Sequence, residues 1–400
     1  MYVKEHSEQT GAEREIRRRI STSGAITFAE FMEVALYHSD GYYSKRGPIG
    51  AGGDYFTSPV AHPAYGALIC VQLETMWRTL GCPSPFWVVE AGAGDGVLGE
   101  DIVRYIRSHF QGFSETLMYV AVDRVATRER ASDGNRIEWI SSTGLPVGGV
   151  VGCVLSNELL DAMPVHRFEV KDGRPFEVYV GLATDGAFVE RLVEPPSPGI
   201  VERVSSVQRQ LPEGYCGEVS MGLRSWMVDV AACLRRGFVL TIDYGYEREQ
   251  LYSDERNRGT LQTYYRHTEG GSPYQRVGRQ DITAHVDFTA LIEEGQQVGL
   301  RPVYLTTQGE FLHSLGYVQM EKALGDWGLA LAVHRANVRA MRRLIDPEGL
   351  GKFKVLVQER DSGIQRDSDL VPGEGVTANL GSPVATSMHL QAGQGSFVAF

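Results

Sequence analysis

The chain changes its hydrophobic pattern near residue 86. From there on, short apolar runs of strand length alternate with segments whose apolar residues recur every three or four positions, as in helices. The runs predicted as strands are residues 86–92, 117–123, 136–141, 150–158, 238–245, 301–307 and 353–359. Strands that alternate with helices predict a mostly parallel sheet covered on both faces, which is an α/β fold.

Helices are predicted between these strands and before them. Thr27 and Glu30 have the spacing of a capping box, which opens a helix that runs to about His38. A later helix carries an apolar stripe that includes Tyr65 and Leu68, and Gly81 is its stop. The other predicted helices are residues 12–20, residues 97–110, a segment bearing Trp226, Val230 and Leu234 that is closed by Gly237, and part of residues 320–345.

Two insertions interrupt the α/β pattern. Residues 165–220 alternate polar and apolar positions around Asp-Gly turns at 172–173 and 185–186, which predicts hairpins. Residues 246–285 are polar, rich in Tyr and Arg, and almost without periodicity. We therefore expect an N-terminal helical cap and loop (1–85), one enlarged core (86–360) that contains both insertions, and a disordered or loosely attached tail (361–400).

Composition and charge exclude several classes of protein. With 42% hydrophobic residues, the 400-residue chain has enough apolar material for a core. The formal charge of −11 argues against non-specific binding to nucleic acid or to anionic membranes. No run of 18 apolar residues predicts a membrane span. The first 20 residues hold four glutamates and no apolar region, so neither a secretory signal nor a mitochondrial presequence is expected, and a cytoplasmic location is predicted.

The cysteines give no sign of a metal site or of a disulfide framework. The five are scattered and none forms a Cys-x-x-Cys pair, so we expect buried thiols in a reducing compartment. No cluster of His, Cys and Asp has the spacing of metal ligands. The sequence therefore predicts chemistry without a metal.

The sharpest local signal is the glycine-rich segment that follows the first predicted strand of the core. A Gly-x-Gly-x-x-Gly dinucleotide fingerprint fails here, because Val97 stands at its last position. The spacing Glu90-x-Gly-x-Gly-x-Gly suits S-adenosylmethionine (SAM) instead, with Glu90 offering negative charge to the ligand ammonium and Asp123 accepting from the ribose hydroxyls. Another nucleotide-like cofactor and a purely structural glycine turn remain alternatives.

Several stretches in chain order resemble one family of SAM-dependent methyltransferases. These are relatives of the mitochondrial complex I assembly factor that methylates an arginine, the MidA/NDUFAF family. The matching stretches, all between about residues 26 and 358, are ITFAEFMEVALYHSDGYYSKRGPIGAGGDYFTSP, VVEAGAGDGVLGEDIVR, SNELLDAMPVHRF, IDYG, GTLQTYYRH, DITAHVDFTAL, TQGEFLHSLG and FKVLV.

The resemblance implies a class I methyltransferase fold, a Rossmann-like sheet of seven strands whose last strand is antiparallel. It also implies which residues bind SAM: Asp54, Thr57, Ser58 and Pro59 from the N-terminal loop, Glu90, Gly92, Gly94 and Gly96 from the glycine turn, Asp123 at the ribose, and Asn157. Asn157, Glu158 and Asp161, just past the fourth strand, are expected to face the transferred methyl group.

The chain departs from the family pattern at four positions. Ala93 and Asp95 replace the usual Pro and Arg of the glycine motif, and Val60 replaces the Glu that usually follows Thr-Ser-Pro. Asp123 replaces a Glu and keeps its chemistry with a shorter reach. The changes at Val60 and Asp95 alter charge close to the site, so they bear on the acceptor more than on the cofactor.

The chemistry of methyl transfer suggests which groups act. A guanidinium acceptor must be oriented in line with the methyl group and must lose a proton, and carboxylates suit both tasks. Glu158 and Asp161 would share one face if a helical turn begins there, so we nominate them with Asn157, and with His285 as a possible base. Asp54 and Asp243 are held in reserve. The alternatives are that Ser156 or Asn157 only caps a helix, that Asp243 only makes a strand-end turn, and that His285 is only hydrogen-bonded.

Three functions are therefore compared. The first is methylation of an arginine in a partner protein, which the acidic balance of the chain suits. The second is O-, N- or C-methylation of a small molecule on the same fold. The third is a non-catalytic assembly protein that keeps the fold for binding a partner. A homodimer is possible in each case.

Overall fold

The computed structural model describes residues 9–45, 57–125, 137–265, 268–365, 370, 377, 380–385 and 389. The chain forms two compact units, each built from three segments. The first unit comprises Met1–Gly47, Asp161–Gly222 and Tyr246–Asp287, and the second comprises Pro48–Leu160, Leu223–Gly245 and Phe288–Phe400. The expected cap of residues 1–85 is thus divided between the two units, whereas both insertions fall largely in the first.

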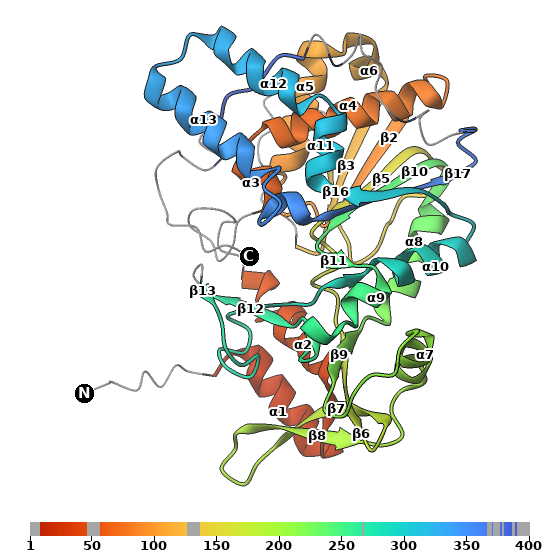
Figure 1. Ribbon diagram of the computed structural model, residues 1–400, viewed down its shortest axis with the longest axis vertical. Coiled ribbons are helices and arrows are strands. Elements are labelled where there is room, and N and C mark those ends of the chain that lie inside the picture. Colours follow the sequence, from red (N-terminus) through yellow and green to blue (C-terminus); the bar gives the residue numbers. More distant parts are fainter. Residues whose placement is uncertain are drawn as a thin grey trace. The chain divides into compact units, whose positions relative to one another are not determined.

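The second unit is built on a seven-stranded sheet (Figure 1). Its strand order is β16-β17-β10-β5-β2-β3-β4. The strands are β2 (Phe86–Ala91), β3 (Leu117–Asp123), β4 (Ile137–Ser141), β5 (Val150–Asn157), β10 (Leu234–Asp243), β16 (Arg301–Thr307) and β17 (Lys354–Arg360). β17 runs antiparallel to both its neighbours, whereas the pairs from β10 to β4 are parallel. This arrangement confirms the predicted class I methyltransferase sheet with one reversed strand.

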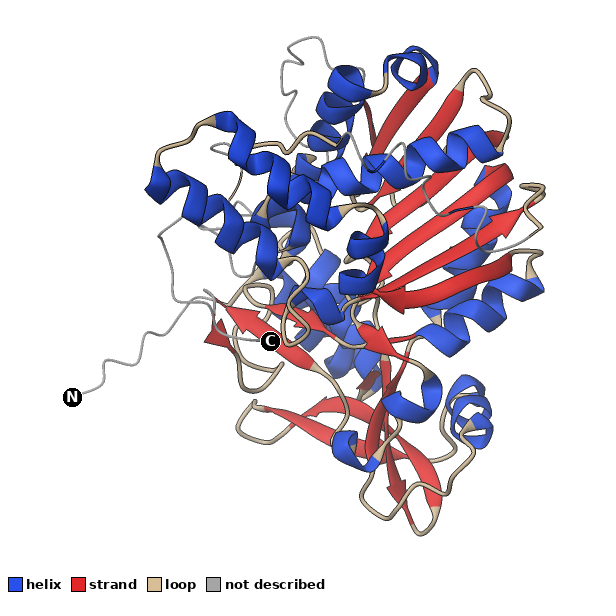
Figure 2. Ribbon diagram, turned by 45° about the horizontal axis from the view of Figure 1, so that its top comes forward, coloured by secondary structure: helices blue, strands red, loops and turns tan. Residues whose placement is uncertain are grey.

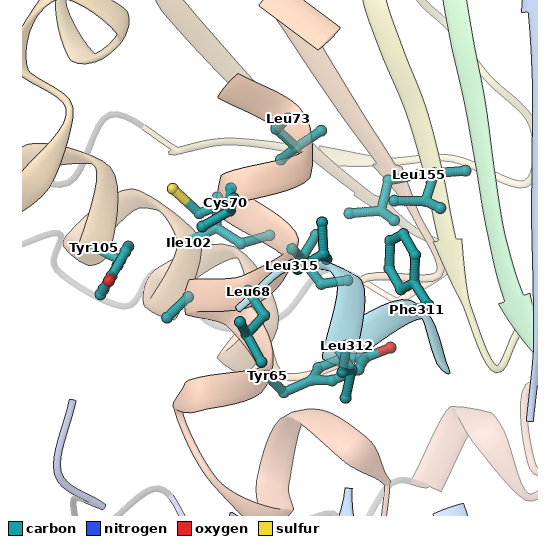
Figure 3. Close-up of a cluster of buried hydrophobic side chains, with 14 of the residues drawn as sticks. Tyr65, Leu68, Cys70, Leu73, Ile102, Tyr105, Leu155, Phe311, Leu312 and Leu315 are labelled. Carbon is teal, nitrogen blue, oxygen red and sulfur yellow. The ribbon is translucent and has the colours of Figure 1, made fainter. Parts of the chain in front are cut away.

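Helices cover both faces of this sheet (Figure 2). On one face, α4 (Ala64–Thr79), α5 (Val97–His109) and α11 (Gln308–Ser314) pack a continuous apolar core against the strands. Figure 3 shows part of this core, including Tyr65, Leu155 and Phe311. On the other face lie α8 (Gly222–Cys233) and α10 (Phe288–Gln297). The remaining helices are α3 (Ser58–Ala61), α6 (Gln111–Thr116), α12 (Tyr317–Ala323) and α13 (Leu331–Arg343), with the 3₁₀ turns η3 (Leu324–Trp327) and η4 (Leu350–Lys352).

The first unit combines two N-terminal helices with an antiparallel sheet. The predicted capping box of Thr27 and Glu30 is present and opens α2 (Phe28–Tyr37), which follows α1 (Gly11–Ser23). The sheet order is β1-β7-β6-β9, with β8 also paired to β7. Its members are β1 (Ile26–Thr27), β6 (His166–Lys171), β7 (Arg174–Leu182), β8 (Phe188–Val193) and β9 (Cys216–Val219). The predicted hairpins are confirmed, because β6 pairs with β7, and β7 with β8, across the two Asp-Gly turns.

The second insertion forms short elements only. They are β11 (Gly245–Tyr246), α9 (Arg248–Leu251), η2 (Asp254–Arg256), β12 (Gln262–Tyr265), β13 (Thr268–Glu269), β14 (Asp281–Thr283) and β15 (Val286–Asp287); η1 (Tyr43–Lys45) and α7 (Pro198–Ser206) complete the first unit.

The helix before β10 ends earlier than its apolar pattern predicts. It stops at Cys233, and Leu234 already belongs to the strand. Gly237 therefore lies inside β10, with φ of +136°. A Cβ there would stand 2.0 Å from the Gly152 carbonyl oxygen, so the glycine permits a close approach between two strands rather than ending a helix. The expected helix within 320–345 is confirmed as α13, and a shorter helix, α12, precedes it.

A few described residues of the C-terminal segment pack on the second unit, whereas the expected loose attachment of the tail as a whole stays a prediction. Leu370, Ser382 and His389 are buried. The Gly381 carbonyl accepts from the Tyr105 hydroxyl at 2.9 Å, and the His389 Nε2 lies 2.7 Å from Asp101 Oδ2. These residues stabilise the second unit. The expectation of buried thiols holds for three of the five cysteines, because Cys82 is exposed and Cys216 is half-buried.

Candidate active site

The glycine turn joins β2 to α5 at the carboxyl edge of the second unit's sheet. Gly92, Gly94 and Gly96 have φ of +70°, +59° and +76°, a region that side chains disfavour. Gly96 is the N-cap of α5, and a Cβ there would meet the Trp139 ring at 2.5 Å. The predicted turn is therefore confirmed in geometry, and Gly92 and Gly96 let the Leu159 and Trp139 side chains approach its backbone closely.

Asp123 is the last residue of β3, and its side chain links this strand to the glycine turn. Its carboxylate is almost fully buried and accepts from the Gly94 N–H at 2.9 Å and from the Val125 N–H at 3.1 Å. Backbone donors thus fix the carboxylate beside the turn. This is the position that the sequence assigned to ribose recognition.

Glu90 is engaged inside the core. Its Oε2 accepts from the Tyr119 hydroxyl at 2.8 Å, and only 3% of the residue is exposed. Burial raises the pKa of Glu90 to about 8; the negative charge of Asp123 adds to the increase, and the Tyr119 hydrogen bond opposes it. A cationic ligand nearby would favour the ionised form, so the predicted role of Glu90 toward the SAM ammonium is electrostatically reasonable and stays a prediction.

The Thr-Ser-Pro segment leads into α3 and is buried throughout. Thr57 is the N-cap of α3, and Ser58 and Pro59 form its first turn. The Ser58 N–H donates to Glu158 Oε1 at 3.4 Å, and the Ser58 hydroxyl donates to Gln308 Oε1 at 3.1 Å. The segment is therefore joined to the end of β5, as its expected place at the site requires. Asp54 lies outside the described residues.

Asn157 and Glu158 form the centre of the site. The Asn157 Oδ1 accepts from the Tyr65 hydroxyl at 2.5 Å, and its Nδ2 donates to Glu158 Oε1 at 3.1 Å. Glu158 has φ of +50°, and its N–H donates to the Ile242 carbonyl of the neighbouring strand. An amide and a carboxylate are thus presented together at the carboxyl end of β5.

The helical turn that would have put Glu158 and Asp161 on one face is not formed after β5. Residues 158–165 form bends and a turn. The cause is Asp243, which is fully buried and whose Oδ2 accepts from the N–H groups of Leu159 at 3.2 Å and Leu160 at 2.8 Å. Glu158 and Asp161 therefore do not share a helix face. Asp243, held in reserve as a catalytic group, instead shapes the turn that carries Glu158.

Asp161 and His285 belong to the first unit. The Asp161 carbonyl accepts from the Ala284 N–H at 2.9 Å, and the His285 N–H donates to the Thr260 hydroxyl at 3.1 Å. The His285 ring packs on Tyr246, with 5.4 Å between ring centroids. Their catalytic roles stay predictions.

Tyr65, Gln308 and Trp139 take part in the site without having been predicted. Tyr65 lay on an apolar stripe and was assigned to the core. Gln308 follows a capping-box threonine, Thr307, and Trp139 stands in a short strand. Gln308 lies in the family-like stretch TQGEFLHSLG, which could have singled it out, whereas the sequence around Tyr65 and Trp139 gave no such signal.

The described residues fit SAM. The glycine turn offers backbone, Asp123 offers a fixed carboxylate at the neighbouring strand end, and buried acidic groups complement a ligand that carries a sulfonium and an ammonium. No group of three or more His, Cys, Asp or Glu side chains among the described residues could hold a metal ion. Nor does any helix in that part of the chain have the length and apolarity to cross a membrane.

The sheet order and the glycine turn at its carboxyl edge define a class I SAM-dependent methyltransferase. A sequence profile of the family described as "Putative S-adenosyl-L-methionine-dependent methyltransferase" matches residues 68–306. The chain belongs to this family. The enzyme is thus a SAM-dependent methyltransferase, as its sequence motifs predicted.

Named relatives and solved structures extend the comparison. The chain is 29% identical over 385 residues to the protein arginine methyltransferase NDUFAF7 homolog, mitochondrial, of Drosophila melanogaster, covering 86% of this chain and 83% of the relative. It is 25% identical to the Rattus norvegicus NDUFAF7, covering 87% and 84%. A Burkholderia thailandensis structure bound to S-adenosyl-homocysteine shares 28% identity, 89% and 93% coverage and a TM-score of 0.78. The resemblance seen in the sequence is confirmed.

Proposed function

We propose that the enzyme methylates an arginine of a partner protein. The observation that carries this proposal is the pairing of Asn157 with Glu158 at the end of β5, where a carboxylate is held by an amide N–H and by the Ser58 backbone. A fixed carboxylate suits a guanidinium, whose planar donors match two carboxylate oxygens. Relatives named protein arginine methyltransferases support the same acceptor.

The chemistry asked of the residues is limited. Bound SAM supplies an electrophilic methyl group. Glu158 orients the guanidinium so that one nitrogen attacks the methyl carbon opposite the sulfur; the N–C bond forms as the C–S bond breaks and its electrons remain on sulfur. Positioning supplies much of the rate in such a displacement. The proton released from the methylated nitrogen passes to the Glu158 carboxylate and then to solvent. Asp161 and His285 are proposed as further groups for the acceptor.

Two substitutions favour a second candidate, a small-molecule acceptor. Val60, which replaces the usual glutamate, is buried in α3, and Asp95 replaces an arginine in the glycine turn. Both substitutions change the charge near the place where a protein acceptor would bind. To separate the candidates, the enzyme is incubated with methyl-labelled SAM and a cell lysate, which is then fractionated by size. Label in the protein fraction supports the arginine proposal, whereas label confined to small molecules rejects it.

The third candidate, a non-catalytic partner-binding protein, is tested by calorimetry. Titration with SAM should show binding to the wild type and loss of binding in Gly94→Val. Absence of SAM binding, with partner binding intact in Gly94→Val, would favour that candidate.

Location and assembly are proposed separately. We keep the cytoplasm as the proposed location, although the relatives compared carry mitochondrial names. Fractionation of cells that express a tagged chain distinguishes the two. A homodimer is proposed as one possible assembly, and light scattering after size exclusion tests it.

A further inference from the structure

One buried tyrosine is hydrogen-bonded to Asn157, a member of the proposed catalytic pair Asn157 and Glu158. Tyr65 is on α4, in the core of the second unit, and none of its surface is exposed (Figure 3). Its hydroxyl donates to Asn157 Oδ1 at 2.5 Å, a short hydrogen bond. The ring packs with the apolar core, and only the hydroxyl takes part in the site.

This hydrogen bond and the Glu158 carboxylate together favour one orientation of the Asn157 amide. With Oδ1 directed at Tyr65, the amide nitrogen is directed at Glu158, where Nδ2 donates to Oε1 at 3.1 Å. A flipped amide would place Oδ1 against the carboxylate, two acceptors without a proton between them. The tyrosine must remain a donor for this arrangement. Burial and the neighbouring carboxylates of Glu158, Glu90 and Asp243 keep the pKa of Tyr65 well above its ordinary value, so its hydroxyl keeps its proton.

We propose that Tyr65 is a positioning residue for methyl transfer, which orients the Glu158 carboxylate through the Asn157 amide. The inference rests on the proposed function, in which Glu158 faces the acceptor. Glu158 Oε1 then receives two donors, Asn157 Nδ2 and the Ser58 N–H. Two donors from different elements restrict the carboxylate more than either alone. Loss of the Tyr65 hydroxyl frees the amide to rotate and removes one of them.

The first test removes only the hydroxyl. Tyr65→Phe should keep SAM affinity within about threefold and lower turnover by about tenfold or more, since small displacements in an active site have effects of this size. The matched control is Tyr105→Phe, in which another core tyrosine of the same unit loses a hydrogen bond, to the Gly381 carbonyl at 2.9 Å. The control should leave turnover unchanged. Equal losses of turnover in both variants would overturn the proposal.

The second test asks whether Tyr65 acts through Glu158. If it does, the double variant Tyr65→Phe/Glu158→Gln should be no slower than Glu158→Gln alone, because residues that act as a unit have non-additive effects. A merely structural tyrosine would multiply the two losses. Additive effects would therefore contradict the inference even if Tyr65→Phe alone is slow.

The third test needs no acceptor, so it separates this inference from the proposed function. The chain has five asparagines, Asn135, Asn157, Asn257, Asn337 and Asn379, and selective ¹⁵N labelling gives five side-chain amide signals. The Asn157 signal, assigned with Asn157→Asp, should shift and exchange faster in Tyr65→Phe but not in Tyr105→Phe. An unmoved signal overturns the orienting role. A moved signal in an enzyme that methylates no arginine would instead reject only the proposed acceptor.

Discussion

The Asp123 carboxylate accepts a hydrogen bond from the Gly94 N–H at 2.9 Å. With the Gly92 and Ala93 N–H groups, which donate to the Val122 carbonyl at 2.8 and 3.2 Å, this bond joins the glycine turn after β2 to the end of β3. Because Gly94 has φ of +59°, any side chain there strains this contact.

Gly94→Val should therefore lose SAM affinity by at least about tenfold, which corresponds to about 1.4 kcal/mol. Isothermal titration measures the loss. The control is Gly81→Val, a glycine with φ of +82° and open space around its Cβ position. It carries similar backbone strain but lies before β2 starts, whereas the glycine turn follows the end of that strand. Equal loss of affinity in both variants would show that general strain, not the turn, is responsible.

Glu90 should make the stability of the protein depend on pH. Burial raises the pKa of Glu90 to about 8 in the folded protein, whereas the ordinary pKa of a glutamate is 4.5. The free energy of unfolding that depends on Glu90 is therefore highest below about pH 4.5. It falls as the pH rises to about 8, by at most about 1.4 kcal/mol per pH unit. Glu90→Gln should remove this decline. Denaturant unfolding of the wild type and of Glu90→Gln, from about pH 5 to about pH 9, measures how the unfolding free energy of each depends on pH. Parallel curves would contradict the buried, proton-holding Glu90.

Asp243 should support both the fold and the rate. Asp243→Asn replaces a charged acceptor of the Leu159 and Leu160 N–H groups by a neutral amide, so we expect a loss of about 1–3 kcal/mol in unfolding free energy. Turnover should fall as well, because the turn that carries Glu158 loosens. Asp346→Asn is the control, since the exposed Asp346 also accepts a backbone N–H, from Glu348 at 3.1 Å. If Asp243→Asn lowered the unfolding free energy but left turnover unchanged, the shape of this turn would have no role in catalysis.

The packed C-terminal segment predicts a penalty for its removal. His389 and Asp101 are both buried, and their contact of 2.7 Å joins residues 288 positions apart. His389→Ala leaves the Asp101 carboxylate with Arg104 as its partner but removes a buried hydrogen bond, so it should reduce the unfolding free energy by about 1–3 kcal/mol. His334→Ala, on α13, should change it by less than about 0.5 kcal/mol. Thermal melts of the two variants that coincide would show that the segment contributes nothing.

The fold was predictable because the inner strands of its sheet are buried on both faces and so appear as continuous apolar runs. The glycine turn was predictable because three glycines at fixed spacing follow such a run. The turn after β5 could not be predicted in this way. Its N–H groups donate to the Asp243 carboxylate, which belongs to a strand more than 80 residues later in the chain. Tyr65 was missed for the same kind of reason: its apolar stripe is a local signal, whereas its hydrogen bond to Asn157 spans 92 positions.

The same limit explains the C-terminal segment. Its sparse apolar residues, such as Leu370 and Leu380, predicted no core of their own, yet they complete the core of the second unit. A segment that packs only onto a structure formed elsewhere shows no periodicity by which to recognise it.

The central claim is that Glu158 serves methyl transfer to a protein arginine. The most direct measurement is amino-acid analysis of the protein fraction after incubation with methyl-labelled SAM, comparing the wild type with Glu158→Gln at saturating SAM. The account predicts labelled methylarginine with the wild type and a loss of about 100-fold with Glu158→Gln, while calorimetry shows SAM affinity within about threefold. Label in another amino acid, or equal methylarginine from both proteins, would contradict it.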